Sequence, residues 1–234
     1  MFKPSDILYE DNHIIVVNKR AGDLVQPDTE GQSALENEIK EFIKKRDEKP
    51  GAVYLGVVHR IDRPVSGAVM FAKTSKALTR LNEMLRKGEI DKRYWAVVEE
   101  LPEVEQDLLV HHIVRDGKTN RSRAHISPKK ESKEARLEYK MIAGSNNYYL
   151  LEVKLFTGRH HQIRCQLSKI GCPIKGDLKY GARRSNPDGG IMLHSRSLTF
   201  MHPVRKEVMS VVAPVPTNDN LWEFFDSAVR ADEE

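Results

Sequence analysis

The chain has 234 residues, of which 39% are hydrophobic and 31% are charged, so it can bury one sizeable core or two small ones and is not expected to be disordered. Its 38 Lys and Arg residues against 34 Asp and Glu residues give a net charge of +4, which by itself is too small to indicate a nucleic-acid binder. No segment approaches the ~18 apolar residues of a membrane span and no signal-type apolar run follows Met1, so we expect a cytoplasmic protein without a membrane partner. The two cysteines are too few for a disulfide framework or a four-cysteine zinc site.

Strand and helix signals alternate in the first part of the chain. A β-branched run predicts a strand over His13–Asn18, and a turn at Ala21–Asp23 leads into Leu24–Val25 as its partner. Apolar residues at i, i+4, i+7 and i+8 predict a helix over Ser33–Arg46, with Ser33 as its N-cap. Two short buried strands and a second amphipathic helix that stops before Gly88 are expected at Gly56–His59, Ala68–Ala72 and Ser75–Lys87.

The rest of the chain is predicted to be rich in strands. Consecutive antiparallel strands, separated by polar turns, are expected at Tyr94–Val98, Leu108–Val110, Ala135–Tyr139 and Tyr148–Val153. A third helix should follow Gly158 and end at Gly171, a residue suited to the left-handed cap position. A last helix is expected from about Asn218 to Arg230, with four inward residues at Leu221, Phe224, Phe225 and Ala228.

Charge is unevenly distributed along this map. Between Lys154 and Lys206 there are eleven basic residues against two acidic ones, and between Arg115 and Arg136 there are eight against three. The second stretch has the composition of an exposed hairpin. A solvated charged face is the simpler reading of either run, but an excess of one sign favours contact with a polyanion.

One short segment carries an unusual set of charges. Asp62 lies between Arg60 and Arg63, at the mouth of two predicted apolar strands. An aspartate beside arginines is more often a structural ion pair than a catalytic group, so spacing alone leaves the function open.

The same segment resembles a family signature. His59–Gly67 reads His-Arg-Ile-Asp-Arg-x-x-Ser-Gly and resembles the His-Arg-Leu-Asp-Arg-x-Thr-Ser-Gly element of the RluA family of pseudouridine synthases. Four further blocks resemble elements of that family in the same order, at Lys92–Val98, Thr157–Leu167, Gly171–Gly181 and Leu193–Pro203. The chain departs from the usual residues of the family at Arg20, Val65, Gln166 and Cys172.

The resemblance implies a fold, a reaction and a partner. The implied fold is the α+β pseudouridine synthase catalytic fold, a mixed and largely antiparallel sheet with flanking helices and a central cleft. Because the resemblance begins at about Ile7, we expect residues 1–234 to form a single catalytic domain without an N-terminal S4 RNA-binding domain. The implied reaction isomerises uridine to pseudouridine in structured RNA, which would be transfer RNA, large-subunit ribosomal RNA or both. Neither a cofactor nor a protein partner is implied.

The resemblance also assigns catalytic residues. Asp62 matches the nucleophile, and attack on the sugar carbon, attack on the pyrimidine ring and a glycal route all stay open. Arg164 matches the cation that keeps this carboxylate ionised, a task that suits bidentate guanidinium geometry. Tyr94 matches the residue that stacks on the target base, and Ile163 would close the other side of the base, unless it is an ordinary core residue.

RNA-binding residues follow from the same comparison. Arg60 resembles an arginine that fills the space of the extruded uridine. His59 and Arg63 either contact the substrate or only fix the loop. The candidates for phosphate contact are Lys175, Lys179, Arg183 and Arg184, with Arg205 and Lys206.

Two other functions compete with this one. A non-catalytic RNA-binding protein could keep the fold, but Asp62, Tyr94 and Arg164 are all present. A glycosidase would need a second carboxylate, for which the matched blocks offer only Asp177. A metal site is not expected, because the histidines occur as adjacent pairs whose side chains diverge.

Overall fold

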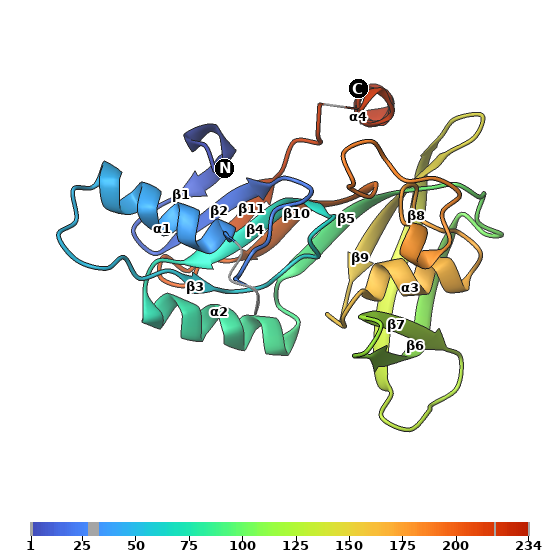
Figure 1. Cartoon of the computed structure of the whole chain (residues 1–234), viewed down its shortest axis with the longest axis horizontal. Coiled ribbons are helices and arrows are strands. Elements are labelled where there is room, and N and C mark those ends of the chain that lie inside the picture. The colour runs from blue at the N-terminus through green and yellow to red at the C-terminus, as the bar shows by residue number, and fades with distance from the viewer. Residues whose placement is uncertain (1, 28–32, 218, 234) are drawn as a thin grey trace. The chain divides into compact units, whose positions relative to one another are not determined.

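The structure, a computed structural model, describes residues 2–27, 33–217 and 219–233. The chain forms two compact units (Figure 1). Unit 1 consists of residues 1–90 and 195–214, and unit 2 consists of residues 91–194 and 215–234. The expected α+β class with a largely antiparallel sheet is confirmed.

Unit 1 contains a sheet with the strand order β1-β2-β4-β10, to which β3 adds on β4 and β11 adds on β10. Its elements are η1 (Pro4–Asp6), β1 (Ile7–Glu10), β2 (Ile14–Lys19), α1 (Leu35–Arg46), β3 (Gly56–Val57), β4 (Ser66–Ala72), α2 (Ser75–Lys87), most of β10 (Leu193–Met201) and β11 (Val208–Val212). Antiparallel pairing joins β2 to both β1 and β4.

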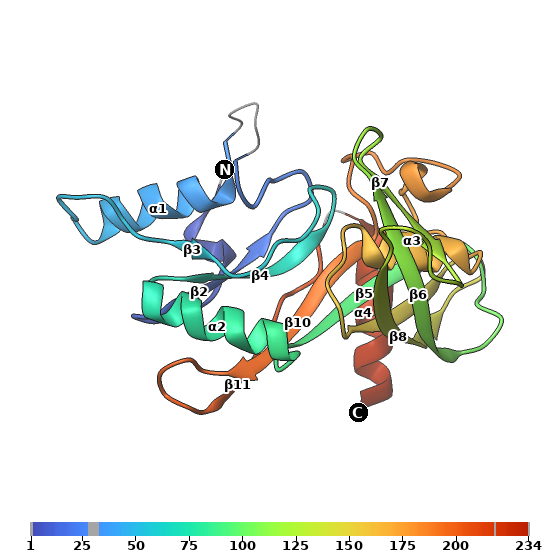
Figure 2. The ribbon, with the colours of Figure 1, turned by 90° about the horizontal axis from the view of Figure 1, so that it is seen from below.

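The core of unit 1 lies on both faces of β2 and β4. Ile14, Ile15, Val16 and Val17 alternate between the two faces and are all fully buried. The face that carries Ile14 and Val16 packs against Leu81 and neighbouring residues of α2. Figure 2 shows α1 and α2 on either side of these strands. Both faces are therefore covered, which explains the continuous β-branched run in the sequence.

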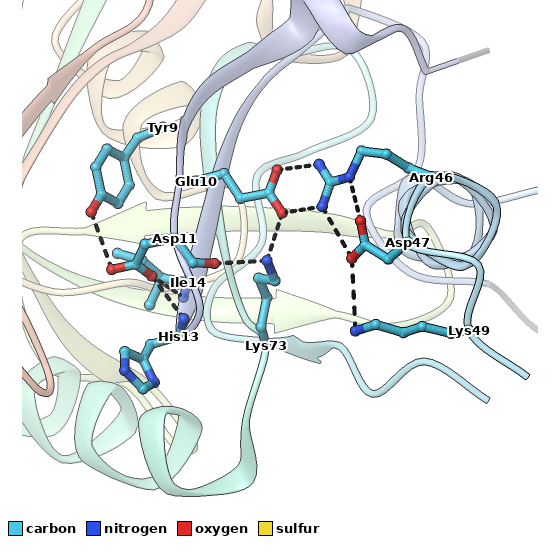
Figure 3. Close-up of polar contacts among 9 residues, drawn as sticks. All are labelled: Tyr9, Glu10, Asp11, His13, Ile14, Arg46, Asp47, Lys49 and Lys73. Carbon is cyan, nitrogen blue, oxygen red and sulfur yellow. Dashed lines mark hydrogen bonds and ion pairs between the residues drawn. The ribbon is translucent and has the colours of Figure 1, made fainter. Parts of the chain in front are cut away.

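A polar cluster ties the end of α1 to the strands (Figure 3). Glu10 at the end of β1 accepts hydrogen bonds from Arg46 at 2.6 Å and from Lys73 at 2.6 Å. Arg46 also binds Asp47, and Lys73 donates to the carbonyl of Asp11. The hydrogen bonds from Arg46 lower the pKa of Glu10 below its ordinary value, so the carboxylate stays charged at neutral pH.

Unit 2 contains an antiparallel sheet with the strand order β5-β9-β8-β6-β7. Its elements are β5 (Asp91–Val98), β6 (Gln106–Asp116), β7 (Arg121–His125), β8 (Lys133–Gly144), β9 (Tyr149–Leu155), α3 (Gln162–Lys169), η2 (Leu178–Tyr180) and α4 (Asn220–Glu233). Helix α3 lies against β6 and β7, and α4 lies against β8. The expected hairpin is the pair β6–β7.

Two local predictions for unit 1 were wrong. Leu24 forms only an isolated bridge with Ala34, and β2 pairs with β1 and β4 instead. The Asp11 carboxylate accepts the N–H groups of the turn between β1 and β2, which favours that pairing. Ser33 does not cap α1. The N-cap is Ala34, and the Ser33 hydroxyl donates to the Glu38 carboxylate instead.

The inward face of the last helix was predicted correctly at Phe225 and incorrectly at Phe224. Phe224 is 47% exposed, whereas Trp222 and Phe225 are buried. These two buried positions are three residues apart and therefore share one helix face, which excludes position 224 from it. The predicted start at Asn218 lies outside the described residues. The predicted helix Ser75–Lys87 and its left-handed end at Gly88 are confirmed.

Candidate active site

Asp62 lies in a tight turn of unit 1 that leads into β4. The carbonyl of Asp62 accepts a hydrogen bond from the N–H of Val65 at 3.0 Å, which closes the turn around Arg63 and Pro64. The Asp62 residue is half-buried, and Ile61 before it and Val65 after it are buried. The carboxylate is therefore carried by a short, fixed loop anchored on both sides in the core.

Lys19, at the end of β2, is a buried cation beneath this loop. Only 1% of the residue is exposed, and Nζ donates to the carbonyl oxygens of Arg20 and Asp23 at 2.8 Å and of Arg63 at 3.0 Å. Burial lowers the pKa of Lys19 to about 8, although the charges of Asp23 and Asp62 oppose this shift. Lys19 is not among the site residues predicted from the sequence. Its signal is a lysine that ends a strand of otherwise buried β-branched residues.

The glycine at the end of this loop, Gly67, is required by its backbone conformation and by a close neighbouring strand. Its φ is +110°, and a Cβ at this position would lie 2.3 Å from the carbonyl oxygen of Ser195 and 2.6 Å from its nitrogen. Because both contacts are with backbone atoms, only glycine fits where β4 and β10 approach each other.

The remaining polar residues of the segment differ in their surroundings. His59 accepts a hydrogen bond from the backbone N–H of Met70 at its Nε2, 3.2 Å away. Arg63 donates from Nε to the carbonyl of Gly22 at 3.0 Å. Both side chains thus have a structural role in fixing the loop. Arg60, by contrast, is exposed.

Arg164 and Asp177 form a buried ion pair in unit 2. The Arg164 Nε lies 2.6 Å from Asp177 Oδ2, and Nη2 lies 2.9 Å from Oδ1, which is bidentate geometry. The two side chains are 6% and 1% exposed. From the sequence, Asp177 was considered only as the second carboxylate of a glycosidase, whereas in the structure it holds Arg164.

The spacing of Asp177 and Tyr180 follows from the short helix η2. Tyr180 donates its N–H to the carbonyl of Asp177 at 2.9 Å, so the two residues are one 3-10 turn apart. Side chains at i and i+3 of such a turn project in the same direction. Asp177 therefore binds the edge of the Arg164 guanidinium while the Tyr180 ring lies 4.9 Å from its central carbon.

His161 precedes α3 in a strained conformation. Its φ is +52°, an uncommon value for a residue other than glycine. Its ring stacks on His160 with centroids 3.7 Å apart, and its Nδ1 lies 2.8 Å from the Tyr180 hydroxyl. Burial and the charge of Arg164 lower the pKa of His161 to about 2, so the ring is neutral.

The proposed base-contacting residues are both buried in unit 2. Tyr94 is 6% exposed and lies in β5 opposite Val153 of β9. Ile163 is 4% exposed and immediately precedes Arg164 on α3. The structure thus places Ile163 and Arg164 together on one helix and Tyr94 on a strand of the same unit.

Of the six predicted phosphate-contact residues, four lie in unit 2, and three of these four already bind within the chain. Lys175 donates to Asn186 at 2.8 Å, and Lys179 donates to the carbonyl of Asn120 at 3.2 Å. Arg183 pairs with Glu100, although its side chain is 76% exposed. Arg184 is exposed. The hairpin β6–β7 adds four exposed cations at Arg115, Lys118, Arg121 and Arg123.

Among the described residues, none of the helices combines the length and apolar character that crossing a membrane requires. Within the same ranges, His, Cys, Asp and Glu side chains do not gather in threes as metal ligands would.

Comparison with known proteins identifies the family. The model of the RNA pseudouridylate synthase family matches residues 13–169. Ribosomal large subunit pseudouridine synthase D of Xylella fastidiosa is 35% identical over 91% of this chain and 66% of its own length. Ribosomal large subunit pseudouridine synthase C of Buchnera aphidicola is 32% identical over 90% of this chain and 67% of its own length. The chain thus spans about two thirds of these curated relatives.

A solved structure supports the same fold. Human RNA Pseudouridylate Synthase Domain Containing 4 superposes with a TM-score of 0.78 over 97% of this chain and 93% of its own, at 22% identity. The matched segment of the family model contains Asp62, Tyr94 and Arg164. The resemblance seen in the sequence is confirmed, and the chain belongs to the RNA pseudouridylate synthase family, with relatives of the RluA type.

Proposed function

We propose that this protein is an RNA pseudouridine synthase that isomerises specific uridines in transfer RNA, large-subunit ribosomal RNA or both, with Asp62 as the nucleophile. The N-glycosidic bond of the uridine breaks, the uracil turns, and a carbon–carbon glycosidic bond forms. No atom is gained or lost, because the detached base is kept and reattached. The reaction therefore needs a site that retains this base, and it also needs a nucleophilic carboxylate. The names of the Xylella and Buchnera relatives favour large-subunit ribosomal RNA.

The observation that carries this proposal is the setting of Asp62. The turn presents a half-buried carboxylate, and the ammonium group of Lys19 beneath it provides a fixed positive charge. The charges of Lys19 and Asp62 attract each other, and the negatively charged carboxylate is the form that attacks. Attack on the sugar, attack on the ring and the glycal route all require this ionised group.

The residues of unit 2 have complementary roles in the proposal. Arg164 is the second cation for the carboxylate, and its orientation is fixed by Asp177. Tyr94 offers a planar ring for stacking on the uracil, and Ile163 offers an apolar surface for its other side.

RNA binding in this proposal combines base extrusion with phosphate contacts. A stacked uridine cannot reach a half-buried carboxylate, so it must leave the stack. The exposed guanidinium of Arg60 can occupy the vacated place by stacking on the neighbouring bases. The cations of hairpin β6–β7 and Arg184 would bind phosphates, and the hairpin is our candidate for choosing the RNA.

Tritium release from 5-³H-uridine-labelled transfer and ribosomal RNA tests the reaction. The wild type should release tritium from one of the two pools, and Asp62→Asn should release none. Asp47→Asn is the matched control, because Asp47 also lies beside an arginine in unit 1 but on the exposed surface, and it should retain activity. No release by the wild type from either pool would favour a non-catalytic RNA-binding protein.

The role of the hairpin requires substitutions rather than a deletion, because β7 contributes Ser122 to the contacts of Tyr180. Replacing the exposed Arg115, Lys118 and Arg123 by alanine should weaken RNA binding and change which RNA is modified. The slope of log K against log salt concentration should fall by about two to three units. The control replaces three exposed lysines of unit 1, Lys44, Lys45 and Lys76. Equal effects of both triple variants would contradict a specific role for the hairpin.

A further inference from the structure

Tyr180 lies where three elements of unit 2 meet. Its hydroxyl accepts the backbone N–H of Ser122 in β7 at 2.7 Å. The same hydroxyl lies 2.8 Å from Nδ1 of His161, the residue that immediately precedes α3. Burial raises the pKa of Tyr180 to about 12, so the hydroxyl keeps its proton and can accept one hydrogen bond while it donates another.

The ring of Tyr180 is fixed as firmly as its hydroxyl. It packs in a buried cluster with Ile113, Ala135 and Cys165, which belong to β6, β8 and α3. Arg121 of β7 lies 5.6 Å from the ring centroid and also binds the carbonyl of Lys179. The ring therefore cannot move without disturbing the base of the hairpin β6–β7.

His161 connects this hydroxyl to Arg164. The left-handed backbone of His161 is unfavourable for a histidine, and such conformations persist only where surrounding contacts hold them. These contacts include the stack on His160 and the hydrogen bond to Tyr180. Because Arg164 is three residues further along, a shift of His161 would displace the first turn of α3 and the guanidinium with it.

We propose that Tyr180 is a positioning residue for Arg164, acting through its ring beneath the guanidinium and through the link of its hydroxyl to His161 and β7. Asp177 fixes one edge of the guanidinium, and Tyr180 fixes its plane and the start of the helix that carries it. This role rests on the proposed function, in which Arg164 serves the carboxylate of Asp62. It also links Arg164 to the hairpin that we propose contacts RNA.

The test compares two tyrosine hydroxyls in unit 2. Tyr180→Phe removes the hydroxyl and keeps the ring. Tyr139→Phe is the matched control, because Tyr139 is also buried and its hydroxyl donates to the carbonyl of Val104 at 3.1 Å. Single-turnover rates and KM are measured on one RNA transcript that the wild type modifies. We expect Tyr180→Phe to lower the rate about three- to tenfold, the effect of losing one or two hydrogen bonds, with KM within twofold. Tyr139→Phe should keep the wild-type rate.

A double-mutant cycle with Arg164→Lys separates positioning from general destabilisation. If Tyr180 acts through Arg164, adding Tyr180→Phe to Arg164→Lys should lower the rate no further. A second cycle uses His161→Asn, because asparagine tolerates the left-handed backbone but is too short to replace the link to Tyr180. His161→Asn should lower the rate as Tyr180→Phe does and should not add to it. All rates are read well below the melting temperature of the least stable variant.

The outcomes distinguish this role from the reaction itself. Losses that multiply in both cycles, or an equal loss in Tyr139→Phe, would overturn the positioning role while leaving the proposed function standing. No product from the wild type would overturn the proposed function and this role with it. A loss in KM alone would assign Tyr180 to RNA binding and would also contradict the proposal.

Discussion

Replacing Asp177 by asparagine should destabilise the protein strongly. The substitution keeps the shape of the side chain but removes the charge that pairs with Arg164, and both side chains are almost completely buried, at 1% and 6% exposure. Breaking a buried pair by removing one partner costs about 3–5 kcal/mol, because the remaining charge stays buried without its counterion. In a chain of this size each kcal/mol lowers the melting temperature by about 2–4 °C, so we expect a decrease of about 6–20 °C.

Thermal melts followed by circular dichroism at neutral pH measure this change. Glu83→Gln is the control, because Glu83 and Lys87 form an ion pair of which both side chains are more than half exposed, and its melting temperature should equal that of the wild type. A melting temperature of Asp177→Asn within about 2 °C of the wild type would refute the reasoning, because it would mean that the pair contributes no stability.

A double substitution separates stability from activity at the same site. Replacing a buried ion pair by apolar residues of similar size is often neutral or stabilising. Arg164→Met combined with Asp177→Leu should therefore recover most of the melting temperature lost in Asp177→Asn, yet form no pseudouridine. Recovery of both stability and activity would contradict the proposed role of Arg164.

Three further predictions concern unit 1. The hydrogen bonds from Arg46 lower the pKa of Glu10, so this carboxylate stabilises the fold at pH values above its ordinary pKa. The stabilisation is lost as the pH falls through the lowered pKa. In a plot of melting temperature against pH, Glu10→Gln should therefore show a shallower decrease on the acid side. Burial lowers the pKa of Lys19 from 10.5 to about 8, so between these pH values the unfolded state binds more protons than the folded state. The free energy of unfolding should therefore rise with pH across this range. Urea denaturation curves should show this rise for the wild type and not for Lys19→Met. Gly67→Ala should lower the free energy of unfolding by more than about 2 kcal/mol in the same measurement, because the residue has a positive φ and its Cβ would collide with backbone atoms. Gly117→Ala is the control and should change it by less than about 1 kcal/mol, because a Cβ at position 117 would have no atom within 4 Å. Equal effects of the two substitutions would contradict the steric argument.

Sequence reasoning succeeded where the determining interactions are local. The helix Ser75–Lys87 has apolar residues at helical spacing and a glycine at its end, so its bounds follow from the sequence and match the structure. The hairpin of Arg115–Arg136 was recognised from its polar turns and its charge. The motif around Asp62, together with the four further blocks in the same order, identified the family, which comparison with relatives confirmed.

Errors occurred where two elements of similar local preference compete for one position. Leu24–Val25 and Ile7–Glu10 are both short apolar segments near the first strand, and the choice between them depends on the carboxylate of Asp11 that closes the turn. Along the chain, β6 follows β5, yet β5 pairs with β9. Strand pairing of this kind depends on burial across the whole sheet, which period-2 patterns do not encode.

The sequence by itself determined which chemical groups the protein has, and only the tertiary structure decided what holds them. Three of these contacts are visible only in three dimensions. Lys19 lies beneath the Asp62 loop, Asp177 binds both donors on one edge of Arg164, and Tyr180 links Arg164 to β7. The residues in these contacts are between 13 and 58 positions apart in the sequence. Contacts between residues so far apart in the sequence depend on which elements pack together and exclude water. The periodicity of a helix or strand indicates only which of its faces is buried, and therefore does not predict these contacts.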